Sequence, residues 1–294
     1  MLAIFKRDFR SYMNTMTGHI FIAFMLLFTG VCVTYFNLII GYSSFSYALE
    51  LVSISFLFVL PILTMKSLSR DRENRTDMLL FSLPLKSSSI VFGKFLAVTA
   101  VFAIPIAVMF IYPIILSAYG FMYYSASYSA IFSLFLLGLA LISVCMFISS
   151  TVENTIISAV ISFGTLILLF FFPFIIAFIP NKPLISFIGL AIISILISLI
   201  VWRLTQNPNI GIIVATIFIV PLCVVFIIKK SLFEGLLPKI LSTLSLYNCF
   251  SELNSGIFDI SNVVYLLSVT VFFLFLSVCS LEKRRWSWSM KRRK

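Results

Sequence analysis

The sequence contains long apolar runs, each about as long as a helix needs to be to cross a lipid bilayer. The runs centre on residues 20–40, 45–65, 90–117, 128–149, 155–179, 185–202, 209–228 and 262–281. About 20 mostly apolar residues make one spanning helix, because each residue advances about 1.5 Å through a hydrocarbon core about 30 Å thick. The pattern therefore predicts an all-α, polytopic membrane protein with about eight transmembrane helices, in which residues 185–228 form a helical hairpin.

The composition excludes a soluble domain as the main part of the chain. Of 294 residues, 61% are hydrophobic and 11% are charged, whereas about a quarter of the residues in soluble domains are charged. The net charge of +11 does not indicate a nucleic-acid partner, because nucleic-acid binders gather basic and aromatic residues on a polar domain that this sequence lacks. Without repeats or low-complexity linkers, residues 1–294 are predicted to form a single transmembrane domain.

Lysine and arginine are unevenly distributed between alternate loops. If the N-terminus lies inside, the opposite side holds only four of the 21 basic residues, namely Lys182, Lys229, Lys230 and Lys239. Because basic residues concentrate on the cytoplasmic side, the distribution predicts that both termini are cytoplasmic. The number of spans is then even, and both eight and six satisfy this condition.

Two segments show the pattern of amphipathic helices at the membrane surface. Within residues 1–18, predicted to be an interfacial helix, apolar side chains recur at helical spacing opposite a basic face. Within residues 229–261, predicted to be extracytoplasmic, a second apolar stripe runs from Phe233 to Leu244. We interpret both segments as membrane anchors rather than as contacts to a substrate.

Three prolines interrupt the sequence around the end of the fifth apolar run. Pro173, Pro180 and Pro183 favour half-helices that dip back into the membrane over residues 170–183, with a clean crossing as the alternative. Four cysteines, Cys32, Cys145, Cys223 and Cys279, lie inside apolar runs and are expected to be buried. Cys249 is expected to be exposed.

The chain lacks the motifs of several catalytic classes. Its one Gly-Lys pair, Gly93-Lys94, is followed by Phe95 and does not form a phosphate-binding loop. A single histidine, His19, cannot supply a histidine pair for zinc, and we interpret it as an interfacial residue. We predict no catalytic, cofactor-binding or metal-binding residue. The spans lack charged residues at their centres, which argues against a secondary transporter.

Polar residues concentrate in residues 66–89, after the second apolar run. From Arg70 to Asp77 six of eight residues are charged with alternating sign, and the apolar set Met78, Leu79, Leu80 and Leu83 follows. Helical spacing predicts a short helix across the cytoplasmic mouth that docks into a groove on a soluble partner. An ordinary solvated loop with the expected positive charge is the alternative, and the residues alone leave both open.

This loop resembles the exit of the second span in ABC-2 type transporter permeases. In that family Pro-x-x-Thr-Met, an Arg/Glu-rich stretch, Thr-Asp/Glu and Leu-Leu-x-x-x-Pro recur in order. The chain carries them as Pro61, Thr64-Met65, Arg70 to Glu73, Thr76-Asp77, Leu79-Leu80 and Pro84. It departs from the family at Arg75, where many members have glycine.

The end of the chain is similar to one branch of the same family. Residues 254–268, a following apolar span and residues 280–286 resemble the gliding-motility and nitrous-oxide-accessory permeases. Together the two motifs and the span pattern cover most of the chain. The family's minimal plan has six spans, so residues 185–228 add an extra hairpin to it.

The resemblance implies a permease subunit of an ATP-driven exporter in the bacterial cell (plasma) membrane. Two copies, or two related permeases, surround a path, while two separate ATPase subunits bind ATP and Mg²⁺; this chain itself is not an enzyme. The implied ATPase-coupling residues are Arg70, Asp71, Arg72, Glu73, Thr76, Asp77, Met78, Leu79 and Leu80. Among them, Arg72, Glu73, Thr76 and Asp77 are expected to dock the ATPase, and Met78, Leu79 and Leu80 to form an apolar seat.

Two other functions stay open from the sequence. The motility branch suggests a subunit that uses ATP to move an attached partner without transporting a substrate. A secondary transporter is a weaker alternative. Lipids, peptides and small molecules all suit a path rich in phenylalanine, so the substrate is not readable.

Overall fold

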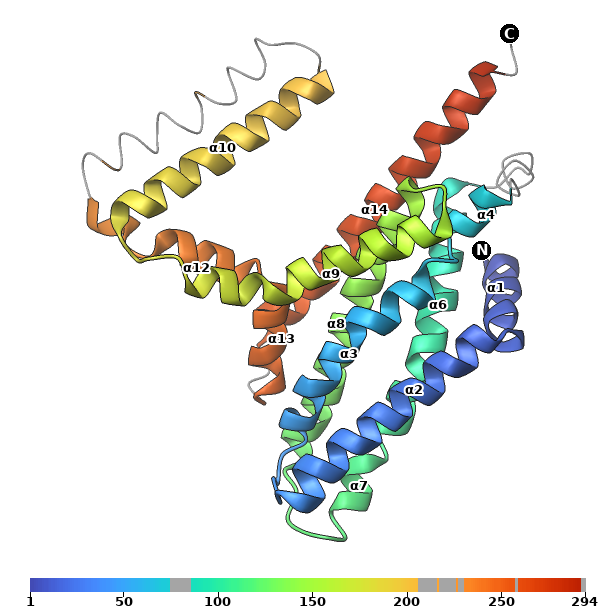
Figure 1. Ribbon diagram of the computed structural model, residues 1–294, viewed down its shortest axis with the longest axis vertical. Helices are drawn as coiled ribbons and strands as arrows, with labels where there is room; N and C mark the ends of the chain where they lie inside the picture. The colour runs from blue at the N-terminus through green and yellow to red at the C-terminus, as the bar shows by residue number, and fades with distance from the viewer. Residues whose placement is uncertain (75–85, 206–215, 217–225, 227–229, 257–258, 292–294) are drawn as a thin grey trace. The chain divides into compact units, whose positions relative to one another are not determined.

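The computed structural model describes residues 1–74, 86–205, 216, 226, 230–256 and 259–291 (Figure 1). All regular elements in this part of the chain are helices. The α-helices are α1 (Leu2–Asn14), α2 (Met16–Val33), α3 (Ser46–Thr64), α4 (Ser69–Glu73), α6 (Ser87–Met109), α7 (Tyr112–Leu116), α8 (Tyr124–Thr151), α9 (Thr155–Ala177), α10 (Pro183–Thr205), α12 (Leu236–Thr243), α13 (Leu246–Asn254) and α14 (Ile260–Lys291). A π-helical turn, η1 (Thr34–Ile39), extends α2, and a 3-10 turn, η2 (Lys230–Phe233), precedes α12.

Six helical segments in the described residues are long and apolar enough to cross a membrane. They cover Met16–Ile39, Ser46–Glu73, Ser87–Leu116, Tyr124–Thr151, Thr155–Ala177 and Ile260–Arg285. The prediction of an all-α protein with several membrane spans is confirmed for the described residues, by the length and composition of these helices. The first arm of the predicted hairpin is the helix α10, whereas most of the second arm, residues 209–228, lies outside the described residues. Eight spans therefore stay a prediction.

The chain divides into two compact units. The first unit comprises Met1–Phe170 and Cys249–Lys294, and the second comprises Phe171–Asn248. In the first unit α8 is the central helix and packs against α3, α6 and α14, while α2 packs against α3 and α6. In the second unit α10 packs against η2 and α12. We describe each unit by itself.

A close contact between α6 and α8 forms the centre of the first unit. A Cβ atom at Gly138 of α8 would lie 2.2 Å from the ring of Phe102, so only glycine admits this phenylalanine. The Phe102 ring also lies 5.5 Å from the Phe56 ring and 6.0 Å from the Phe135 ring, measured between centroids. Small residues allow helices to approach closely, which is a usual source of packing in membrane proteins.

The predicted interfacial helix within residues 1–18 forms as α1 and packs against α6 and α2. Its apolar face is divided, because Ile4 and Tyr12 are buried whereas Leu2 is 81% exposed. Gly93 of α6 allows the close approach, since a Cβ atom there would lie 3.2 Å from Ile4. The helix is therefore part of the bundle as well as a candidate for contact with lipid.

Three expectations are corrected by the structure. No break into half-helices occurs at Pro173, because α9 runs continuously through this proline and ends at Ala177; re-entry of residues 170–183 into the membrane stays a prediction. Pro183 begins α10, a position where its missing N–H breaks no helical hydrogen bond. Cys249, expected to be exposed, is buried with 4% exposure, and Cys279, expected to be buried, is exposed because its face of α14 is uncovered.

Candidate functional site

Polar contacts gather at one end of the first unit. Helices α1, α4 and α6 meet there through charged side chains, and the turn between α8 and α9 joins them. The C-terminal half of α14 reaches the same turn, where Arg284 forms an ion pair of 2.9 Å with Glu153. The segments that the sequence assigned to the cytoplasmic side thus lie together at one end of this unit.

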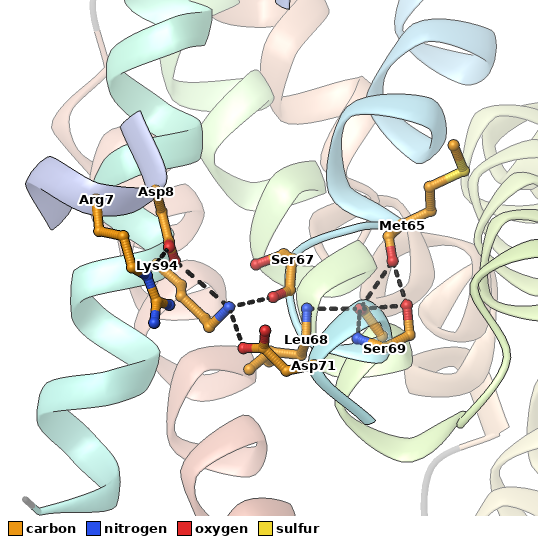
Figure 2. A network of polar contacts seen from close by, with 9 residues as sticks. Arg7, Asp8, Met65, Ser67, Leu68, Ser69, Asp71 and Lys94 are labelled. Carbon is orange, nitrogen blue, oxygen red and sulfur yellow. Dashed lines mark hydrogen bonds and ion pairs between the residues drawn. The ribbon is translucent and has the colours of Figure 1, made fainter. Parts of the chain in front are cut away.

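Lys94 of α6 is at the centre of these contacts (Figure 2). Its side chain is 5% exposed, and its Nζ lies 2.6 Å from Asp71 Oδ2 and 3.4 Å from Asp8 Oδ2. The same ammonium donates a hydrogen bond to the carbonyl of Ser67, and Arg7 Nε lies 2.7 Å from Asp8 Oδ1. Because a buried charge is costly without partners, these contacts fix α1 and α4 relative to α6.

Tyr12 makes a second connection between α1 and the bundle. Its hydroxyl donates a hydrogen bond of 3.1 Å to the carbonyl of Leu63, in the last turn of α3. Burial raises the pKa of Tyr12 above its ordinary value, and the carboxylates of Asp8 and Asp71 raise this pKa further. The phenol therefore stays neutral and keeps its donor proton at physiological pH.

The start of α4 is capped by another helix. Ser149 of α8 accepts hydrogen bonds from the backbone N–H groups of Leu68 at 3.2 Å and Ser69 at 3.0 Å. These groups are at the N-terminus of α4, where backbone donors lack partners within the helix. The Ser69 hydroxyl donates to the carbonyl of Met65, which closes the bend between α3 and α4.

The predicted coupling residues fall into three groups: one exposed residue, three residues that contact the bundle, and five residues outside the described part. Arg70 is the exposed residue, whereas Asp71 pairs with Lys94. Arg72 is 8% exposed and its Nη1 lies 3.5 Å from the Val152 carbonyl. Glu73 accepts hydrogen bonds from Thr155, 2.7 Å from its Oγ1 and 3.3 Å from its backbone nitrogen.

Thus Asp71, Arg72 and Glu73 hold α4 against the bundle. The first residues of the predicted short helix are helical, in α4 (Ser69–Glu73). The remaining predicted residues, Thr76, Asp77, Met78, Leu79 and Leu80, lie outside the described residues.

A cavity of about 210 Å³ lies beside Lys94, between α1, the start of α2, the α3–α4 connection and α6. In the part of the chain that the structure describes, four basic residues line it, namely Arg7, Lys66, Arg70 and Lys94. Two acidic residues, Asp8 and Asp71, complete its charged wall. Among the residues that the structure describes, no group of His, Cys, Asp or Glu side chains has a geometry suited to a metal ion.

Several residues of this site escaped the sequence interpretation. The charge distribution places Lys94 on the cytoplasmic side, but its burial in the second turn of α6 is not predicted by the sequence. A lysine beside a long apolar run is a signal that carboxylate partners are needed. The identity of those partners, Asp8 and Asp71, has no local sequence signal, and Ser149 resembles the other serines of its helix.

No protein-family model and no curated protein matches this chain. The resemblance to ABC-2 type permeases therefore rests on the residue motifs alone.

Proposed function

We propose that this chain is the membrane-spanning permease subunit of an ATP-binding-cassette exporter of the ABC-2 type. The observation that carries the proposal is the placement of α4, a short charged helix that directly follows the second apolar span. It is fixed by buried polar contacts to α6, α8 and the α8–α9 turn. The apolar residues Met78 to Leu80 follow it in sequence.

The contacts of α4 suggest how force from an ATPase enters the bundle. A displacement of α4 changes the Asp71–Lys94 ion pair, the hydrogen bonds that Ser149 and Glu73 accept, and the hydrogen bond that Arg72 donates, all at the same time. We assign contact with the ATPase to exposed Arg70 and to residues 76–80. Asp71, Arg72 and Glu73 then pass the motion to the spanning helices.

The rest of the complex follows from the resemblance. Two ATPase subunits bind ATP and Mg²⁺, and a second permease copy or a related permease completes the path in the cell membrane. A subunit that moves an attached partner without transporting a substrate uses the same α4 contacts. Both versions predict that an ATPase binds this chain.

The proposal is tested by purifying the tagged chain from its native membranes with its bound ATPase. Replacing Leu79 and Leu80 with Asp is expected to reduce the retained ATPase more than tenfold, because losing contacts at a desolvated interface costs about 2 kcal/mol or more. The matched control reverses charge at Lys291 and Arg292 in the tail. Equal ATPase retention and equal ATP hydrolysis in both variants, or the absence of any ATPase from the wild-type preparation, would remove the proposal.

Substitution of Glu73 is a poor probe of docking. Its carboxylate accepts hydrogen bonds at the N-terminus of α9, so its loss weakens that helix start as well. Arg70→Glu is the cleaner single change, with Arg10→Glu as a control on an exposed face of α1. A smaller amount of bound ATPase in Arg70→Glu alone supports a docking role for this residue.

A further inference from the structure

The cavity beside Lys94 carries an excess of positive charge. Among the described residues, its four basic and two acidic lining residues give a net charge of +2. The acidic residues are already engaged, since Asp8 pairs with Arg7 and Lys94 while Asp71 pairs with Lys94. In the described part of the chain, Lys66 and Arg70 take part in none of the ion pairs. These two cations are the unneutralised part of the wall.

Hydroxyl groups line the side of the cavity next to α2. Thr15 and Thr17 lie there with Ser11. Thr15 donates its hydroxyl proton to the carbonyl of Tyr12 at 3.2 Å and accepts from Thr17 at 2.9 Å, so the hydroxyl of Ser11 is the one left to donate to a ligand. Hydroxyl groups and cations together are the donors that proteins use to bind phosphate oxygens. A carboxylate-binding site needs fewer donors, and a cation site needs the opposite charge.

The position of the cavity matches the surface of a membrane. The first candidate span begins at Met16, which is 81% exposed, and two of the lining threonines are its neighbours in the chain. Lipid headgroups lie at the level where an apolar helix gives way to polar residues. Basic pockets between helices at this level bind the headgroups of anionic lipids.

The size of the cavity limits its ligand. A volume of about 210 Å³ corresponds to about seven water molecules at roughly 30 Å³ each. Drug-sized ligands use pockets of about 300–1,000 Å³. The cavity therefore suits one phosphate group with a small attached group, and not a whole transported substrate.

We propose that this cavity binds a phosphate group, with Lys66 and Arg70 as the binding cations and Ser11 as a hydroxyl donor. Lys94 is a positioning residue, because its contacts with Asp8 and Asp71 shape the wall. The phosphate belongs either to the headgroup of an anionic phospholipid or to a free phosphate ion. The site does not depend on the proposed ATPase partner, so its test uses the isolated chain.

The test measures binding to the purified full chain in neutral detergent. The probes are short-chain phosphatidylglycerol, the corresponding diacylglycerol without phosphate, and inorganic phosphate. The cavity variant is Lys66→Gln with Arg70→Gln. The matched control is Arg10→Gln with Lys86→Gln, which removes the same charge from exposed residues of α1 and the α6 start that do not line the cavity.

We expect the wild-type chain to bind phosphatidylglycerol at least tenfold more tightly than diacylglycerol. Each cation contributes about fivefold to the affinity for an anionic lipid headgroup. The affinity of the cavity variant for phosphatidylglycerol should therefore fall about 25-fold. The control variant should stay within about twofold of the wild type, because its cations lie outside the cavity. Competition by inorganic phosphate at equal affinity assigns the site to the free ion, and its failure to compete assigns the site to the lipid.

Three results would overturn the proposal. The first is equal affinity of the wild-type chain for phosphatidylglycerol and diacylglycerol when inorganic phosphate also fails to bind. The second is an equal loss of affinity in the cavity and control variants, which indicates only general surface charge. The third is undiminished binding by a folded cavity variant. If the double variant does not fold, the single variant Lys66→Gln and the wild-type comparison decide the question.

Discussion

At the scale of single residues, Lys94 shows how a charge is accommodated inside a helical bundle. An ammonium that is 5% exposed needs partners that replace its lost water, and two carboxylates and a carbonyl do so. The partners belong to α1, to α4 and to the connection before α4. One side chain thereby joins α6 to α1 and to the segment around α4, which are far apart in the sequence.

Replacing Lys94 with alanine should lower the free energy of unfolding by about 3 kcal/mol, because Asp8 and Asp71 both lose their contact with this buried cation. The comparison is Lys86→Ala, which replaces an exposed lysine at the start of the same helix. This variant should change the free energy of unfolding by about 0.5 kcal/mol or less. Thermal unfolding of both variants in detergent measures the difference. Equal melting temperatures would show that the ion pairs contribute nothing.

The chemistry of Cys249 should depend on pH in a particular way. Burial raises the pKa of its thiol to about 11 from an ordinary value of 9.0, with smaller contributions from Glu252 and Asp259. At pH 8 the reactive thiolate is then about 100-fold scarcer than for an unperturbed thiol. Because the folded protein holds this proton more tightly, the thiolate fraction should keep rising until the pH approaches 11.

Alkylation of Cys249 by a water-soluble maleimide measures this effect. The control is a cysteine placed at exposed Ser255 on the same segment, whose labelling should level off near pH 9. Labelling of Cys249 as fast as the control at pH 8 would contradict both its burial and its raised pKa.

At the scale of elements, α4 depends on its surroundings. Five residues are too few to form a stable helix in isolation, because the first helical turn costs more than it returns. The hydroxyl of Ser149 accepts hydrogen bonds from two backbone N–H groups at the start of α4. Ion pairs and hydrogen bonds hold the later residues of α4. The helix is therefore a product of the packing of α6 and α8.

Ser149→Ala should lower the free energy of unfolding by about 2 kcal/mol, because the buried N–H groups of Leu68 and Ser69 lose their acceptor. A matched control is Ser133→Ala, which removes a buried hydroxyl of the same helix that bonds only to the carbonyl of Ala130. Hydrogen exchange at the amides of α4 should accelerate in Ser149→Ala alone. Unchanged exchange would mean that α4 does not need this cap.

At the scale of the molecule, the first unit has two distinct ends. One end gathers the charged residues around Lys94 and the α8–α9 turn. At the other end Tyr123 donates a backbone hydrogen bond to Ser43, and the side chain of Asn254 donates one to the carbonyl of Ser46. Because basic residues mark the cytoplasmic side, the Lys94 end is expected to face the cytoplasm.

Labelling of single cysteines in a cysteine-free background tests this orientation. Asn74→Cys, at the Lys94 end, should react with an impermeant reagent only after the membrane is opened. Tyr119→Cys, on an exposed side chain at the other end, should react in intact cells. The reverse pattern would invert the topology, and labelling of both sites in intact cells would contradict the placement of the two ends on opposite sides.

The sequence alone determined the class of protein and the approximate position of its spans. Apolar length and composition are local properties, so six of the predicted spans correspond to described helical segments that are long and apolar enough to cross a membrane, and the first residues of the predicted short helix after the second span lie in α4. The sequence motifs also supplied the functional proposal, because a motif is a pattern of neighbouring residues. The predicted coupling residues beyond Asn74 lie outside the described residues, so their role stays a prediction from the sequence.

The tertiary structure alone decided which polar side chains meet. Ser149 and Ser69 are 80 residues apart in the chain and Arg72 and Val152 are also 80 apart, so no local pattern relates them. The burial of Cys249 and Lys94 likewise depends on which helix faces cover them. Burial determines whether a charge needs a partner or water, and burial is a property of packed helices rather than of a segment of sequence.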